Sequence, residues 1–101
     1  MSLTPLSGKQ KIYLRGLGHS LKPLMQVGKF GVTDAFVTKA QDILLQHELV
    51  KIKVMKGAPI SAKDAAAELE QKLPCHVAQI IGKTILIYAP RPEDPTIKIP
   101  K

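Results

Sequence analysis

The chain has 101 residues, of which 45% are hydrophobic and 23% are charged, and its net charge is +7. This composition excludes a disordered or collagen-like chain and predicts one domain spanning residues 1–101. No run of about 20 apolar residues could cross a bilayer, and no signal peptide begins the chain, so we expect a cytoplasmic protein. Cys75 is the only cysteine, which excludes an internal disulfide.

The first predicted helix begins at Ser7, because Ser7 and Gln10 have the spacing of a capping box, and it runs to about Gly18. On a helical wheel one side is apolar, and we expect it to pack on the rest of the protein. That side carries Leu14, Leu17 and Leu21. A second side is expected to face solvent and is basic, with Lys11, Arg15, His19 and Lys22.

The middle of the chain reads as strand, helix, strand and helix. Residues 24–27 are a short apolar run typical of a strand, and Thr33 is a suitable N-cap for a helix to about His47. Residues 50–54 alternate between apolar side chains and the lysines Lys51 and Lys53, as in a strand with one buried face. Ser61 has the capping-box spacing again and begins a helix that ends before Pro74.

The last two strands are predicted at residues 76–81 and 84–89, where Gly82 and Lys83 suit a type II′ hairpin. The second of them is apolar on both faces and should lie inside the sheet. A Pro-rich tail follows at residues 90–101, in which Ile97 and Ile99 are candidates to hold the tail to the body. The fold class is therefore α/β, a compact domain of αβαβαββ order with three helices on a mixed four-stranded sheet; the strand order does not follow.

The sequence Gly28-Lys29-Phe30-Gly31 forms a GxxG motif between a predicted strand and a predicted helix. Glycines let the backbone approach a ligand closely, and we expect the amides to point outward at the start of the helix, where phosphate binds. Alone, this spacing often marks only a tight turn. Residues 1–33 nevertheless carry five basic and no acidic residues, which favours a phosphate polymer as partner. Phe30 is expected either to stack on a base or to anchor the loop inward.

Other chemistry finds little support. The histidines and Cys75 lack the spacing of a zinc motif, and Gly82-Lys83-Thr84 is not a P-loop because Val77 stands where that motif needs glycine. No Ser, Thr or Cys is joined to a recognisable base. We therefore expect no enzyme activity, no cofactor, no metal and no small-molecule substrate.

Four stretches of the chain resemble the bacterial YhbY-like proteins, stand-alone members of the CRM family of RNA-binding domains: residues 14–23, 28–34, 47–54 and 81–83. The resemblance implies a fold similar to the C-terminal domain of translation initiation factor three, with RNA bound at the GxxG loop and the neighbouring basic surface. It also implies a role as an assembly factor of the precursor large ribosomal subunit. Two departures are Arg91, which is displaced from the family's usual position, and Gly18, which replaces an alanine and should loosen the first helix.

The basic surface and the resemblance together predict an RNA-binding protein, and the resemblance implies that its partner is ribosomal RNA. The oligomeric state does not follow from the sequence, and we expect a monomer. The predicted RNA-binding residues are Gly28, Lys29, Phe30, Gly31, Lys11, Arg15, Lys22, Lys51 and Lys53. Two alternatives stay open: a ribosome-associated adaptor that binds proteins without recognising RNA directly, and a domain that binds duplex DNA regardless of sequence.

Overall fold

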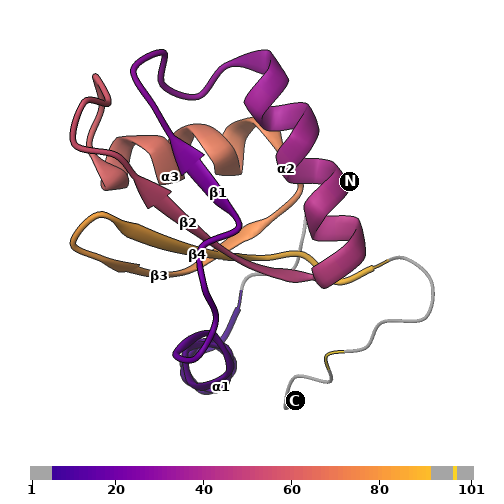
Figure 1. The fold of residues 1–101 in the computed structure, drawn as a ribbon. Helices are drawn as coiled ribbons and strands as arrows, with labels where there is room; N and C mark the ends of the chain where they lie inside the picture. The colour runs from indigo at the N-terminus through magenta and orange to yellow at the C-terminus, as the bar shows by residue number, and fades with distance from the viewer. Residues whose placement is uncertain (1–5, 92–96, 98–101) are drawn as a thin grey trace.

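The structure is a computed structural model in which residues 6–91 and residue 97 are described. Its elements follow the predicted αβαβαββ order (Figure 1). They are α1 (Gly8–Gly18), β1 (Met25–Val27), α2 (Asp34–His47), β2 (Leu49–Val54), α3 (Ala62–Lys72), β3 (His76–Ile81) and β4 (Thr84–Tyr88). The strands form one sheet in the order β1-β2-β4-β3, with β1 parallel to β2 and the other two pairs antiparallel. The predicted fold class is confirmed.

Each helix begins at the residue that the sequence indicates. Ser7 Oγ accepts from the Gln10 N–H and the Gln10 side chain accepts from the Ser7 N–H, which completes the capping box of α1. The Thr33 and Ser61 hydroxyls each accept a hydrogen bond of 3.1 Å from the N–H three residues later, at the starts of α2 and α3. These bonds satisfy amides that have no partner within the helix.

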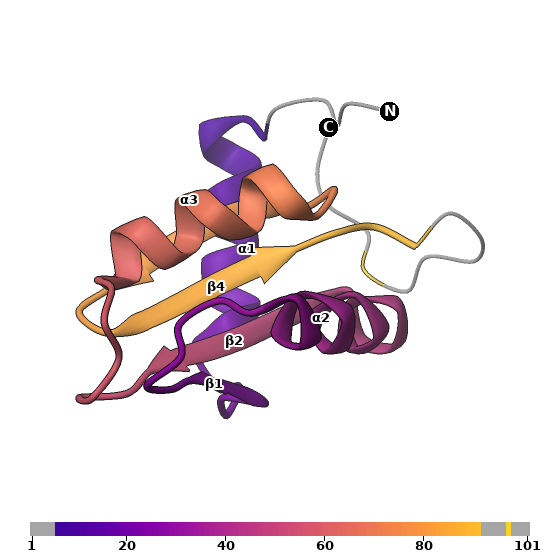
Figure 2. The same ribbon diagram turned by 90° about the horizontal axis from the view of Figure 1, so that it is seen from above.

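The sheet lies between two layers of helices, with α2 and α3 on one face and α1 on the other (Figures 1 and 2). Alternate residues of β2 divide between the faces: Val50, Ile52 and Val54 join the core beneath α2 and α3, whereas Leu49 packs with Leu14 of α1. Lys51 and Lys53 therefore lie on the α1 face of the sheet. No helix among the described residues is long and apolar enough to span a membrane.

Strand β4 is the interior strand that the sequence predicts. It pairs with β2 on one side and with β3 on the other, and its residues Ile85 to Tyr88 are all buried. Ile81 pairs with Thr84 across the turn, and Gly82 has a φ of +55°, as the first central residue of a type II′ turn requires.

The packing side of α1 differs from the prediction. Leu14 is fully buried, but Leu17 and Leu21 are 39% and 38% exposed, and the second contact with the sheet is made by Gly18. A Cβ on Gly18 would lie only 2.6 Å from Leu86 Cδ2. Because α1 ends at Gly18, Leu21 lies outside the helical repeat. Gly18 therefore lets the helix approach the sheet, and it is not merely a loosening substitution.

Beyond β4 the chain is held by Glu48, whose side chain is fully buried. Glu48 Oε2 accepts from the Arg91 N–H at 3.2 Å, and Oε1 accepts from the Ile97 N–H at 3.1 Å. The Arg91 guanidinium adds an ion pair, with Nε 3.9 Å from Oε1. Ile97 also packs against the cluster under α1, as predicted, whereas Ile99 lies outside the described residues. Arg91 thus has a structural role in the tail.

Candidate nucleic-acid interface

The GxxG motif forms a hydrogen-bonded turn at the end of β1. The Gly31 N–H donates to the Gly28 carbonyl at 3.0 Å, and Gly31 has a φ of +70°, a conformation that suits glycine. A Cβ at Gly31 would lie 3.6 Å from Pro59, so the turn rests on the connection between β2 and α3. The turn is therefore held in place from both sides, since Val27 before it and Val32 after it are buried.

Two backbone amides of this turn are free to bind a ligand. The N–H groups of Lys29 and Phe30 donate to no acceptor within residues 6–91 and 97. Gly31 uses its N–H inside the turn, and Val32 and Thr33 separate it from α2, whose first turn is capped by Thr33. Helix α2 begins at Asp34, directly after the predicted N-cap Thr33, so the amides of the motif precede the helix and are not part of its first turn.

The side chains of the turn point outward. Phe30 is 77% exposed and belongs to neither hydrophobic cluster, so the inward alternative is wrong. Lys29 Nζ lies 5.1 Å from the centroid of the Phe30 ring, within the range of a cation–π contact. The motif therefore presents a cation and an aromatic ring together.

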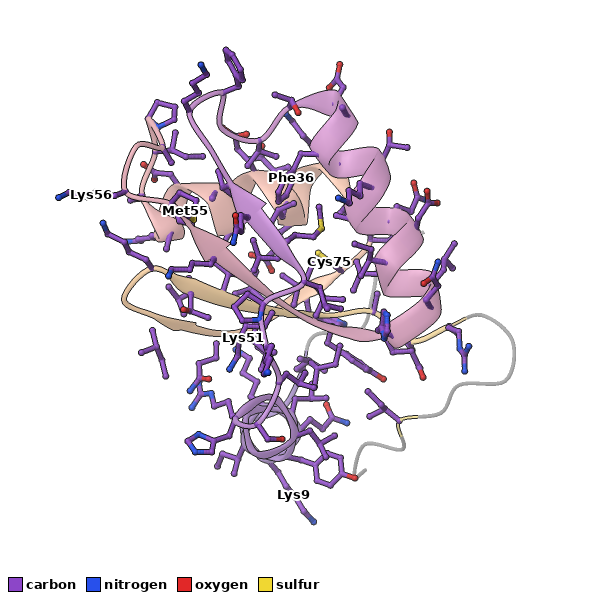
Figure 3. All side chains as sticks on the ribbon, viewed as in Figure 1. Lys9, Phe36, Lys51, Met55, Lys56 and Cys75 are labelled. Atoms are coloured by element: carbon purple, nitrogen blue, oxygen red, sulfur yellow. The ribbon has the colours of Figure 1, made fainter. Side chains whose placement is uncertain are left out.

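Three further lysines lie at the same end of the sheet. Lys53 pairs with Gln26 of β1 and with Thr84 of β4, and the Val54 N–H donates to the Lys83 carbonyl at 2.7 Å. Lys56 extends outward from the connection between β2 and α3 (Figure 3). We call this set the loop-end cluster: Lys29, Lys53, Lys56 and Lys83.

Two members of the loop-end cluster, Lys56 and Lys83, are not among the RNA-binding residues predicted from the sequence. Lys56 belongs to the lysine-rich segment 51–56, and Lys83 occupies the tip of the predicted hairpin, so both carried a signal. The parallel pairing of β1 with β2 brings the segment of Lys56 beside the GxxG turn, and the antiparallel pairing of β2 with β4 brings Lys83 to the same end. The cluster is not free of acids, because Asp34 and Asp64 stand in the first turns of α2 and α3.

The basic side of α1 that the sequence predicts is largely exposed: Arg15, His19 and Lys22 are exposed, and Lys11 is half-buried. Lys11 and Arg15 flank the buried residues Leu14 and Gly18 on the helix, so they lie at the edge of the side that packs on the sheet. Arg15 Nε donates to the Ala78 carbonyl at 3.1 Å, at the irregularity in β3 between Val77 and Gln79. Arg15 therefore helps to hold α1 on β3.

Lys11 lies away from the GxxG turn. It lines a shallow hollow with Glu70 and His76, and His76 pairs with Tyr88 at the end of the sheet opposite the hairpin. Burial lowers the pKa of His76, Glu70 raises it, and the charge of Lys11 lowers it further. Lys11 is thus separated from the loop-end cluster by the length of the sheet.

The other two predicted lysines lie between these extremes. Lys51 is half-buried opposite Leu86 in the middle of β2, and Lys22 is exposed in the connection from α1 to β1. That connection passes beside β2, because the Leu24 N–H donates to the Lys51 carbonyl at 3.0 Å. Of the lysines predicted outside the GxxG motif, the structure therefore places only Lys53 directly at the loop end.

Cys75 is a buried, free cysteine in surroundings that disfavour the thiolate. Burial, followed by the charge of Glu70, raises its pKa to about 12, and its Sγ lies 3.8 Å from the Leu69 carbonyl. Among the described residues, no three His, Cys, Asp or Glu side chains gather in a group that could hold a metal ion.

The order of elements and the sequence together match one known family of domains. The sequence profile of the CRS1 / YhbY (CRM) domain matches residues 6–89. The chain belongs to this family.

Individual relatives cover nearly the whole chain. The Probable RNA-binding protein YqeI of Bacillus subtilis is 36% identical over 95 residues, which are 94% of this chain and 99% of that protein. An RNA-binding protein of Haemophilus influenzae is 33% identical over 100 residues, covering 98% of this chain and 99% of that protein. The solution structure of SAV1595 from Staphylococcus aureus, proposed there to bind RNA, has a TM-score of 0.80 and 34% identity, covering 95% of this chain and all of that one.

Proposed function

We propose that this protein binds RNA through the GxxG turn and the loop-end cluster, and that it acts in the cytoplasm as an assembly factor on ribosomal RNA of the precursor large subunit. The observation that carries the RNA-binding part is the exposed turn, in which two N–H groups have no acceptor in the described part of the chain and the Lys29 ammonium lies beside further lysines. Family membership and the names of the relatives support the same reading. The ribosomal part rests on the family resemblance alone.

The turn would act by holding the sugar-phosphate backbone. Backbone N–H groups and ammonium groups are the donors that phosphate oxygens accept from, and such contacts position an RNA without reading its sequence. Each phosphate neutralised by a lysine releases condensed counterions, so the affinity falls as the salt concentration rises. The GxxG loop of KH domains clamps a nucleic-acid backbone in a comparable manner.

A salt titration tests the role of the turn. Replacing Lys29 with Ala should reduce the slope of log affinity against log salt by about one unit or less. Lys9→Ala is the matched control, because Lys9 projects from α1 on the side of the molecule away from Lys56 (Figure 3). If Lys29→Ala and Lys9→Ala change the slope equally, the turn is not the phosphate site. Arg15 is a poor probe, since its loss also removes a bond to β3.

Two further experiments test the partner. Competition between RNA and DNA duplexes of the same sequence should favour RNA if the 2′-hydroxyl is contacted, and equal affinity would favour the DNA-binding alternative. Crosslinking in cells followed by sequencing should recover precursor ribosomal RNA of the large subunit. Association with ribosomes that survives nuclease treatment, without crosslinked RNA, would favour the protein-binding adaptor.

A further inference from the structure

The exposed ring of Phe30 is not accounted for by phosphate binding. The chain has two Phe, two Tyr and no Trp, and three of these four rings are at least partly covered: Tyr88 is buried, Phe36 is packed against the core, and Tyr13 is 42% exposed. Phe30 is 77% exposed at the tip of a turn. An apolar ring has no hydrogen-bond donor for a phosphate oxygen. If the exposed ring has a function, it must therefore contact another group of the ligand.

The fold does not need this ring. Gly31 and Val32 hold the turn to the body, while Phe30 belongs to neither hydrophobic cluster. The ring does have one neighbour, the Lys29 ammonium, whose nitrogen is 5.1 Å from its centroid. A cation over one ring face leaves the opposite face open. The same two residues also carry the unpaired N–H groups of the turn.

We infer that Phe30 stacks on the base of an unpaired nucleotide, so that the turn selects RNA with a bulged or single-stranded nucleotide over a perfect duplex. This inference rests on the proposed RNA-binding function and adds the class of RNA. The base would lie on the ring face opposite Lys29, while the N–H groups of Lys29 and Phe30 and the lysine ammonium hold phosphates of the same strand. Bases in a continuous duplex are already stacked on each other and offer no free face to a side chain.

Charge favours RNA over a protein partner for this ring. The loop-end cluster places the ring among lysines, and a base with its phosphate supplies both the flat surface and the negative charge that these groups complement. An apolar protein surface would leave the ammonium groups without partners. Burial of the ring by a protein is the competing outcome of the test.

The test compares three RNA duplexes of equal length: one fully paired, one with a bulged adenine, and one with a bulged abasic site. The wild-type protein should bind the adenine bulge more tightly than the other two. Phe30→Ala should weaken binding of the adenine bulge by roughly 5- to 100-fold, and should change binding of the paired and abasic RNAs by less than about twofold. Phe30→Leu, which keeps an apolar side chain without a ring, should behave like Phe30→Ala.

The salt dependence of the affinity distinguishes base stacking by Phe30 from phosphate binding by the turn. Loss of stacking should lower the affinity of Phe30→Ala equally at every salt concentration, whereas Lys29→Ala should change the slope. Thermal melting of Phe30→Ala should match the wild type, because the ring packs against neither cluster. Phe30→Trp supplies the only indole of the chain, and its fluorescence should be quenched by the adenine bulge but not by the abasic one.

The outcomes are distinct. If Phe30→Ala binds all three RNAs as the wild type does, or loses the same factor on each, stacking is refuted while the lysine slopes still support RNA binding. If the wild type binds none of the RNAs, both proposals fail. If the ring is instead protected by a ribosomal protein in the absence of RNA, the partner is a protein and the inference is wrong.

Discussion

Replacing Glu48 with Gln should destabilise the fold more than replacing any surface carboxylate. The Glu48 side chain is 0% exposed and accepts backbone hydrogen bonds from Arg91 and Ile97 through its two carboxylate oxygens. Its backbone carbonyl also accepts from the Ala89 N–H at 2.9 Å, and its φ of +63° sits at the C-cap of α2. The substitution keeps the volume and the backbone conformation, so it isolates the carboxylate.

The magnitude follows from these contacts. A glutamine has only one carbonyl oxygen, so one of the two N–H donors loses its acceptor and faces an NH₂ group instead. A hydrogen bond to a charged group contributes about 1.5–3 kcal/mol, and a buried donor without a partner costs a further penalty. The Arg91 guanidinium also loses its counter-charge. We expect a loss of about 3 kcal/mol from a total stability of about 5–15 kcal/mol.

Urea denaturation followed by circular dichroism measures this loss directly. For a protein of this size, 3 kcal/mol corresponds to a fall in melting temperature of about 12–24 °C. Glu68→Gln is the matched control, because Glu68 is 39% exposed and pairs with Lys72 at 3.6 Å on the surface of α3, where the pair contributes less than about 1 kcal/mol. If the two variants lose the same free energy of unfolding, the tail is not held by the buried carboxylate.

Two of the glycines of α1, Gly16 and Gly18, and the side chain of His76 give two further predictions. Gly16→Ala should stabilise the protein by about 0.5–1 kcal/mol through helix propensity, since nothing lies within 4 Å of its added methyl group. Gly18→Ala should destabilise the protein by about 1 kcal/mol net, because the added methyl group meets the buried side chain of Leu86. Urea denaturation measures the free energy of unfolding of both variants. A higher free energy of unfolding for both would contradict the close approach of α1 to the sheet. Burial lowers the pKa of His76 below its ordinary value of 6.5. As the pH falls through 6.5, this side chain therefore takes up a proton in the unfolded chain before it does so in the folded protein. The free energy of unfolding should fall as the pH falls below this value. His76→Phe should flatten this part of the pH profile of the free energy of unfolding, and an unchanged profile would refute the assignment.

The parts of the fold that depend on neighbouring residues could be predicted from the sequence. Ser7, Thr33 and Ser61 cap their helices through bonds that span three residues, and the alternation around Ile52 reflects a single buried face. These features are visible because the atoms that create them are close in the chain.

The features that the sequence leaves open or predicts wrongly depend on contacts between residues far apart in the chain. The sheet-facing side of α1 is set by Leu86, and the strand order is set by pairing between segments far apart in sequence. The outward position of Phe30 is seen only in the folded turn, in which the neighbouring Gly31 lies against Pro59. The membership of Lys56 and Lys83 in the loop-end cluster likewise needs the three-dimensional arrangement, as does the role of Arg91 beside Glu48.

The proposed ligand site and the anchor of the C-terminal segment lie at opposite ends of the sheet. The GxxG turn, the β2–α3 connection and the β3–β4 hairpin all meet at one end, while Glu48 fastens the tail at the other. The proposed function therefore implies that changes in the length or residues of these three turns alter ligand preference with little effect on the anchoring of the C-terminal segment. Under that proposal, a library randomised only in those turns is a practical starting point for engineering new RNA specificities on this scaffold.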